Sequence, residues 1–287
     1  MEDLLPDVLK KLWGKVEDGR LSADEFGRMQ DSLVGEYRRI WEDALLLEGF
    51  EDLQESVVSE IGSYLGRNDS TEIKRLCCQA LAHIKGEWQQ KVDTIDKESV
   101  EQFYDQSRAM IYELMWWHTL ADDLSPLAYV VALKLAQRHE CGRCLDFGSG
   151  VGSGGILFAR HGMEVTLADI SSTALDFSSW RFERRGLPSV HLDLKNSRLP
   201  EAAFDFITAM DVFEHLVNPV ETVRDVDRAL KQGGFLFGRF HAEADEDRPH
   251  HIILDFQPTL KELQARGFVR VWQDEWLWGH EVYRKMP

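Results

Sequence analysis

The spacing of apolar residues changes near residue 140 of the chain. Before that point, apolar positions recur every three or four residues, which is the period of an amphipathic helix. The clearest such segment begins with a capping box, Ser22 to Glu25, and closes at Gly49. Its apolar stripe consists of Phe26, Met29, Leu33, Tyr37, Ile40, Trp41 and Ala44. We therefore predict a long helix over this segment.

Three more segments before the change predict helices. Residues 71–88 repeat the pattern through Ile73, Cys77, Ala80, Ile84 and Trp88. A further helix is expected at about 97–118, and another begins at a Ser125 cap and runs to about residue 140. Residues 1–124 therefore predict an all-α N-terminal domain.

After the change, short apolar runs alternate with helical segments. Strands are predicted at about 143–148, 164–170, 189–194, 204–211 and 235–240, and helices at about 152–161, 171–185 and 218–231. This alternation is typical of βαβ units with helices on both faces of a parallel sheet. Two adjacent runs near the end, GFVRVWQDEW and GHEVYRKM, predict an antiparallel hairpin. For residues 125–287 we expect an α/β fold: a Rossmann-like doubly wound sheet, mostly parallel, with a C-terminal antiparallel hairpin.

Charge narrows the classes of partner. The 287 residues include 33 Lys and Arg against 50 Asp and Glu, a net charge of −17. Such a chain repels nucleic acid and anionic membranes unless a basic patch intervenes, and the sequence indicates none. The opening stretch MEDLLPDVLKKLW lacks the features of a signal peptide, and no apolar run is long enough to span a bilayer. We expect a cytoplasmic protein with a small-molecule substrate and with neither a nucleic-acid nor a membrane partner.

The stretch CLDFGSGVGSGG places Asp146 at the entrance of a glycine-rich loop that follows the first predicted strand. Ligands of such sheets lie beyond the carboxyl ends of the strands. A dinucleotide pyrophosphate needs the pattern GxGxxG, which fails when read from Gly148 and fits only weakly when read from Gly150. A carboxylate at this entrance would repel a pyrophosphate. S-adenosylmethionine has no phosphate and carries an ammonium and a sulfonium, so Asp146 favours that ligand.

Residues 126–286 resemble the class I S-adenosylmethionine-dependent methyltransferases that act on small molecules. The first motif of this family, an acid followed by GxGxG, stands here as LDFGSGVG. The second, an acid that ends strand two, stands as VTLADIS with Asp169, and the third stands as HLDLKN with Asp193. The fourth strand and its exit, from FDFITAMDVFEHL to KQGGFLF, resemble the family over more than thirty residues.

The resemblance implies a set of cofactor contacts. Asp169 is expected to accept both ribose hydroxyls, Asp193 to meet the adenine amino group, and Asp146 to lie near the aminoacyl end. The whole implied cofactor site comprises Asp146, Gly148, Ser149, Gly150, Gly152, Asp169, Ile170, Asp193, Leu194 and Met210. The alternative is a Rossmann-like fold that binds no S-adenosylmethionine.

Four histidines are candidates for the chemistry. Methyl transfer is an in-line displacement, so the enzyme mainly aligns the reactants, and a hydroxyl or ammonium acceptor needs a base for its proton. His215 follows the fourth predicted strand and His241 ends the fifth, while an acidic loop leads into His250 and His251. We predict that these residues act as base or position the substrate. Pocket shaping and a solvated loop are the alternatives.

A metal site is the weaker hypothesis. Asp211, Glu214, His215 and His251 resemble the metal ligands of the small-RNA terminal 2′-O-methyltransferases. Asp211 stands where that family has glutamate, and nothing in the chain is basic enough for an RNA backbone. We therefore expect no metal.

The adjacent Trp116 and Trp117 cannot both point inward from one helix, so one of them faces a groove, a partner or the pocket. In the resembled family, N-terminal helices often lie across the pocket as a lid. We predict such a lid, with homodimer contact through these helices or plain core packing as alternatives.

These observations predict an enzyme that transfers a methyl group from S-adenosylmethionine to oxygen or nitrogen of a small organic substrate. Two other interpretations stay open. The protein could methylate a macromolecule, with its acidic helices docking a basic protein, or it could bind the cofactor without turnover. The complete set of loop glycines and acids argues against the latter.

Overall fold

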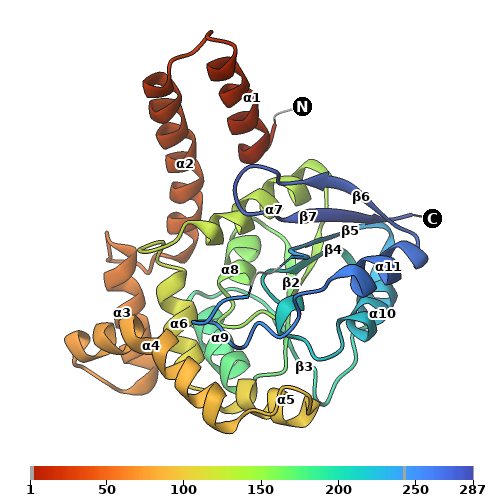
Figure 1. Cartoon of the computed structure of the whole chain (residues 1–287). Coiled ribbons are helices and arrows are strands. Elements are labelled where there is room, and N and C mark those ends of the chain that lie inside the picture. Colours follow the sequence, from red (N-terminus) through yellow and green to blue (C-terminus); the bar gives the residue numbers. More distant parts are fainter. Residues whose placement is uncertain (1–2, 242–243, 287) are drawn as a thin grey trace.

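The computed structural model describes residues 3–241 and 244–286 (Figure 1). Its centre is one seven-stranded sheet in the order β3-β2-β1-β4-β5-β7-β6. The strands are β1 (Arg143–Phe147), β2 (Glu164–Asp169), β3 (Val190–Asp193), β4 (Phe204–Ala209), β5 (Leu230–Gly238), β6 (Phe268–Gln273) and β7 (Glu281–Lys285). The first five are parallel, and β7 runs antiparallel to both β5 and β6. The predicted α/β class, the parallel strands and the C-terminal hairpin are confirmed.

Helices cover both faces of the sheet, as a buried parallel sheet requires. One face packs with α7 (Ala128–Arg138), α8 (Ser153–Arg160) and α9 (Ser172–Arg184), whose apolar residues belong to the larger core. The other face packs with α10 (Pro219–Ala229) and α11 (Gln257–Ala265), which belong to the second core. The carboxyl ends of the parallel strands stay uncovered by these helices, and the site lies there.

The N-terminal part is helical, as predicted. Its elements are α1 (Leu5–Glu17), α2 (Ala23–Leu45), α3 (Leu53–Leu65), α4 (Ser70–Lys91), α5 (Lys97–Gln106) and α6 (Ala109–Trp117). The capping box at Ser22 is present, but the helix that it begins ends at Leu45 rather than at Gly49. The single helix expected at 97–118 is two, because Ser107 has an extended backbone. The Ser107 hydroxyl donates a hydrogen bond to Glu87 of α4, which holds the break in place.

Helices α1 and α2 form a column that projects from the body of the molecule, whereas α3 to α6 lie against it (Figure 1). Trp41 of α2, Ile61 of α3 and Met115 of α6 are fully buried in the same core as Phe158 of α8. The helical part and the sheet therefore share one core. The division of the chain at residues 124 and 125 stays a prediction about domains.

Among the described residues, none of the helices has both the length and the apolar character that crossing a bilayer would need.

Candidate active site

A cavity of about 670 Å³ opens at the carboxyl ends of β1, β2 and β4. In a doubly wound sheet this is where ligands bind, beside the strand at which the winding direction reverses. The glycine loop and the end of β2 form one side of the wall, and the segment after β4 forms another. Helices α5 and α6 complete it together with the loop that leads to His251.

The glycine loop packs closely against side chains from two other segments. Gly148 and Gly150 have φ values of +70° and +49°, a backbone region that favours glycine. A Cβ on Gly148 would lie 2.5 Å from a methyl group of Val212, and one on Gly150 would lie 2.8 Å from Leu114 of α6. The N–H groups of Gly148 and Ser149 donate to the carbonyl of Ala168 in β2. These groups are therefore used inside the protein rather than offered to a phosphate.

Asp146 does not lie where the sequence led us to expect it. Its side chain is fully buried and is absent from the cavity wall. It accepts hydrogen bonds from the N–H of Gly155 in the first turn of α8, at 3.0 Å, and from the hydroxyl of Thr208 in β4, at 2.9 Å. Burial raises the pKa of this carboxyl to about 7. The acid occupies the helix N-terminus that would otherwise bind a phosphate, and it lies outside the cavity wall.

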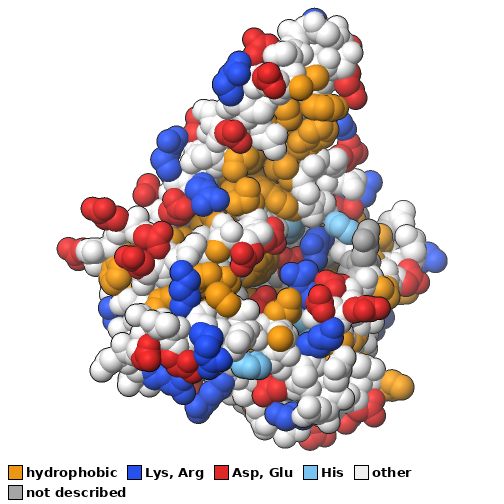
Figure 2. Space-filling model, turned by 60° about the vertical axis from the view of Figure 1, so that its left-hand side comes forward, with side chains coloured by type: hydrophobic (Ala, Val, Ile, Leu, Met, Phe, Trp, Pro, Cys, Tyr) orange, Lys and Arg blue, Asp and Glu red, His pale blue; other side chains and the backbone are white. Residues whose placement is uncertain are grey.

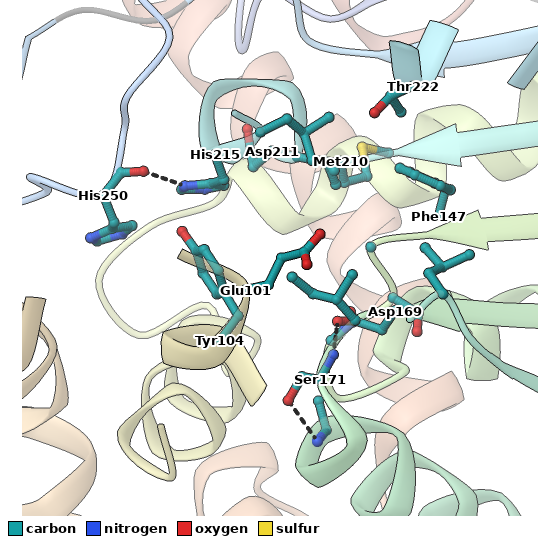
Figure 3. A pocket seen from close by; sticks show the side chains of 18 of the residues that line it. Glu101, Tyr104, Phe147, Asp169, Ser171, Met210, Asp211, His215, Thr222 and His250 are labelled. Carbon is teal, nitrogen blue, oxygen red and sulfur yellow. Dashed lines mark hydrogen bonds between the residues drawn. The ribbon is translucent and has the colours of Figure 1, made fainter. Parts of the chain in front are cut away.

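Asp169 ends β2 and lines the cavity (Figure 3). One carboxylate oxygen accepts from the N–H of Gly150 at 2.8 Å, and the other accepts from the N–H of Ser171 at 2.9 Å. Burial raises its pKa, which these backbone donors oppose. A carboxylate has about four acceptor positions, so Asp169 retains the capacity to accept hydrogen bonds from a ligand.

The other expected cofactor residues divide into two groups. The wall includes Gly148, Ser149, Gly150, Ile170, Leu194 and Met210. Gly152 instead caps α8 from behind the loop, and both oxygens of Asp193 are used in a turn. They accept from the N–H of Lys195 and from the amide of Asn196. Asp193 does not line the cavity, whereas its neighbour Leu194 does.

Three of the four candidate histidines meet at the other end of the cavity. His215 lies in the short helix η2 (Phe213–His215), and His250 and His251 come from the loop before α11. One ring nitrogen of each lies within 4.8 Å of the others. Burial lowers the pKa of His250 to about 2 and that of His251 to about 4, so both rings are neutral at neutral pH.

His241, the fourth candidate, is exposed and lies outside the wall of this cavity, with its ring against Gly279. The acidic loop that follows it includes residues 242 and 243, which are outside the described part of the chain.

The carboxylates of the hypothetical metal set are engaged elsewhere. Arg239, just after β5, pairs with Asp211 at 2.9 Å and with Glu214 at 3.0 Å. Asp211 has a φ of +48°, a strained conformation for a residue other than glycine. The backbone carbonyl of Glu214 accepts from the N–H groups of Ile252 and Ile253, which holds the histidine loop in place. The four residues Asp211, Glu214, His215 and His251 therefore do not form one ligand set.

Sequence reasoning missed Glu113 of α6, which lines the cavity. It is the only charged residue in that helix, AMIYELMWW, and an acid in an apolar run was the available signal. Burial raises the pKa of Glu113 to about 7, with the positive charge of Arg248 acting against this shift and the negative charge of Asp211 adding to it. Tyr104 of α5 also faces His215, with 5.9 Å between ring centroids (Figure 3).

The side chains of the two adjacent tryptophans lie in different surroundings, as expected. Trp117 lines the cavity and donates its indole N–H to Asp123 and Ser125. Trp116 does not line the cavity, and the ammonium of Lys74 lies over its ring.

Basic residues gather around the cavity despite the acidic composition, and basic and acidic side chains alternate on this face (Figure 2). Each of them has an acidic partner among the described residues except Arg198. The pairs are Lys97–Glu101, Arg224–Glu262, Arg228–Asp225, Arg239–Asp211 and Arg248–Asp245. This face is therefore a mixture of charges rather than a basic patch.

Comparison with known proteins adds an independent finding. Residues 145–238 match the Methyltransferase domain family. The chain is 29% identical over 150 residues to the Ubiquinone biosynthesis O-methyltransferase of Coxiella burnetii, a match that covers 50% of this chain and 61% of that protein. It is 31% identical over 134 residues to the protein of the same name from Paracidovorax citrulli, covering 42% of this chain and 55% of that one. The chain thus spans less than two thirds of the length of these relatives.

Among solved structures, the N-methyltransferase NodS from Bradyrhizobium japonicum aligns with a TM-score of 0.48 and 16% identity, over 58% of this chain and 99% of that chain. The family match over residues 145–238, the curated relatives and the motifs that lead into the cavity support a class I S-adenosylmethionine-dependent methyltransferase in this part of the chain.

Proposed function

We propose that the protein transfers a methyl group from S-adenosylmethionine to an oxygen of a small organic substrate, with nitrogen as the alternative acceptor. One observation carries this proposal: a single cavity joins the cofactor motifs at the strand ends to a cluster of histidines with Tyr104 and Glu113. Its volume of about 670 Å³ is typical of small-molecule sites.

The residues at the strand ends fit the cofactor. Asp169 is proposed to accept hydrogen bonds from the ribose hydroxyls, and the hydroxyl of Ser149 is buried in the wall without a partner in the described chain. The glycines at 148 and 150 let the loop lie directly against Val212 and Leu114, which also line the cavity. When bound, S-adenosylmethionine supplies a methyl group attached to a positively charged sulfur.

Glu113 is proposed to take the proton that a hydroxyl acceptor must lose. A general base works best when its pKa lies near the working pH, and burial raises that of Glu113 to about 7. His215, His250 and His251 are proposed to position the acceptor, together with Tyr104. His241 lies outside the wall, and we assign it no role.

Helices α5 and α6 are proposed to act as the lid. Leu114 of α6 lies against the glycine loop, and Trp117 and Tyr104 contribute to the wall. Exclusion of water strengthens electrostatic interactions inside a site and protects the reactive methyl group.

The choice of a small substrate and of oxygen rests on two supports. The curated relatives bear the name Ubiquinone biosynthesis O-methyltransferase. The mixed charges around the cavity do not favour an extended anionic polymer.

The first experiment is thermal unfolding with and without S-adenosylmethionine, S-adenosylhomocysteine and NADH. A ligand at a hundred times its dissociation constant adds about 2.7 kcal/mol, which raises Tm by several degrees. We expect a rise with the first two ligands, loss of that rise in Asp169→Ala, and retention in Asp193→Ala. Asp193 is the matched control because it pairs in register with Asp169 but lies outside the cavity wall.

A rise in Tm with NADH alone would contradict the proposal, and so would the absence of a rise with every ligand. If the cofactor binds, acceptors are tested by the release of S-adenosylhomocysteine. Release with hydroxyl-bearing small molecules, and not with basic proteins, would indicate a small substrate rather than a macromolecular one. Binding without release from any acceptor would indicate a module without turnover.

A further inference from the structure

The three clustered histidines share a geometry that suits a metal ion. His215, His250 and His251 each direct one ring nitrogen to a common region, with all three nitrogens within 4.8 Å of one another. They come from two segments 35 residues apart in sequence, both of which line the cavity. Three imidazoles are a common ligand set for a catalytic zinc ion.

A hydrogen bond to the backbone fixes the tautomer of the His215 ring. Its Nδ1 lies 2.9 Å from the backbone carbonyl of His250 (Figure 3). A carbonyl oxygen can only accept, so Nδ1 carries the proton and Nε2 keeps its lone pair. A hydrogen bond from the second ring nitrogen to a carbonyl is the usual support for a histidine that binds metal through the first.

His250 supplies an independent observation. Its side chain is only 6% exposed, and its Nδ1 is buried without a hydrogen-bond partner in the described part of the chain. Most buried polar side-chain atoms have a partner. A ligand at the cluster would supply one.

The surroundings select the kind of ion. The carboxylates of Asp211 and Glu214 are paired with Arg239, and among the described residues only the three histidines belong to the cluster, so its donors are nitrogens. Mg²⁺ and Ca²⁺ prefer oxygen ligands, whereas imidazole suits Zn²⁺ and its transition-metal neighbours. The charge of Arg239 is balanced by these carboxylates, and Arg248 pairs with Asp245.

The three ring nitrogens are close enough for small movements to bring them onto one ion. Tetrahedral Zn²⁺ holds nitrogens about 3.3 Å apart at Zn–N distances of about 2.0–2.1 Å, so a pair at the 4.8 Å limit must close by about 1.5 Å. His250 and His251 lie in a segment of turns and irregular backbone between residues 244 and 256, which can make such an adjustment more easily than a helix or strand.

We propose that His215, His250 and His251 bind one divalent ion of the zinc class, and that its remaining position faces the cavity and takes an oxygen of the methyl acceptor. The substrate class is thereby narrowed to molecules with a hydroxyl group. The ion site stands independently of the proposed function, whereas the contact with the acceptor rests on it.

The test is a titration of the full chain, without an affinity tag, with Co²⁺, whose visible absorption reports coordination by nitrogen. We expect one saturable equivalent that Zn²⁺ displaces. In His251→Ala and His250→Gln the affinity should fall at least 100-fold. His241→Ala should bind as the wild type does, because that histidine lies outside the cavity wall. Circular dichroism checks that each variant is folded.

The absence of saturable uptake, or equal uptake by folded His251→Ala, would overturn the ion site. A Tm rise with S-adenosylhomocysteine in the same samples tests cofactor binding separately. The proposed function and the ion site can therefore fail independently. For the acceptor half, phenol should alter the Co²⁺ spectrum and anisole, its methyl ether, should not. An unchanged spectrum with phenol would overturn that half.

Discussion

At the scale of single residues, Glu113 shows how burial can prepare an acid for proton transfer. It stands on α6, one of the helices proposed to act as a lid, and it lines the cavity. Burial disfavours the charged form, which raises the pKa to about 7. A carboxyl with this pKa is half ionised near neutral pH and can take a proton there.

The first prediction is that activity depends on the ionisation of Glu113. In the wild type, kcat/KM should rise with pH through about 7, because the carboxylate is the active form. Glu113→Gln should lower kcat by about 10²–10⁴-fold and remove this limb of the profile. The profile is measured by release of S-adenosylhomocysteine. An unchanged limb in the variant would show that another group titrates.

The second prediction concerns stability at the same residue. A carboxyl whose pKa is raised in the folded state, here from 4.5 to about 7, stabilises the fold below its ordinary pKa and loses this contribution as pH rises through 7. Glu113→Gln should therefore be more stable than the wild type at pH 8, by up to about 3 kcal/mol. At pH 4 the two should be similar. Urea unfolding at the two pH values checks this, and equal differences at both would contradict it.

Asp146 carries the third prediction. Replacement by alanine leaves the N–H of Gly155 and the hydroxyl of Thr208 buried without their partner. The free energy of unfolding should fall by about 2–4 kcal/mol. Asp146→Asn keeps one acceptor and the volume, so its loss should be smaller. Equal effects in the two variants, measured by urea unfolding, would argue that the hydrogen bonds contribute little.

At the scale of elements, the N-terminal helices brace the glycine loop through one buried ion cluster. Glu60 of α3 is 1% exposed and pairs with Arg181 and Arg185 at the end of α9. Arg181 also donates to the carbonyl of Val151 at 2.6 Å and to the hydroxyl of Ser153 at 2.8 Å. The loop that faces the cavity is therefore held from behind by Arg181, which in turn pairs with Glu60 of the helical part.

The fourth prediction follows from this brace. Glu60→Gln leaves two buried arginines without a carboxylate, which should cost about 3–5 kcal/mol of stability. S-adenosylhomocysteine should bind more weakly, because Val151 and Ser153 lose their support, and the KM for the acceptor should change less. Glu55→Gln, an exposed position on the same helix, is the control. Isothermal titration separates the effects, and unchanged cofactor affinity in folded Glu60→Gln would contradict the brace.

At the scale of the whole molecule, the shared core links the two parts of the chain. Trp41 of α2 is fully buried and stacks on Tyr129 of α7, with 5.6 Å between ring centroids. The indole N–H of Trp41 donates to the carbonyl of His118. Residues on both sides of positions 124 and 125 therefore contribute to one core. A homodimer through the N-terminal helices and a cytoplasmic location stay predictions.

The fifth prediction is that residues 125–287 do not fold alone. Their removal from the helices would expose Tyr129 and the apolar face of α7 and α8, which lie in the larger core. We expect the fragment to lack near-ultraviolet circular dichroism and a cooperative thermal transition, both of which the full chain should show. A cooperative transition in the fragment would support an independent domain.

The sequence by itself determined the local elements and the resemblance to a family. The capping box at Ser22, the alternation of strands and helices, and the placement of Asp169 at the end of β2 all depend on residues close together in the chain. The glycines at 148 and 150 belong to this group, because their backbone conformation excludes most other residues. Such features can be predicted since neighbours in sequence supply the interactions.

Only the tertiary structure decided where the side chains point and which of them meet. It turned Asp146 towards α8 and Thr208, and it used Asp193 in a turn. It brought His250 and His251 to His215 through the hydrogen bonds that Glu214 makes with the loop. These outcomes depend on partners that are distant in sequence and on burial, which no local pattern records.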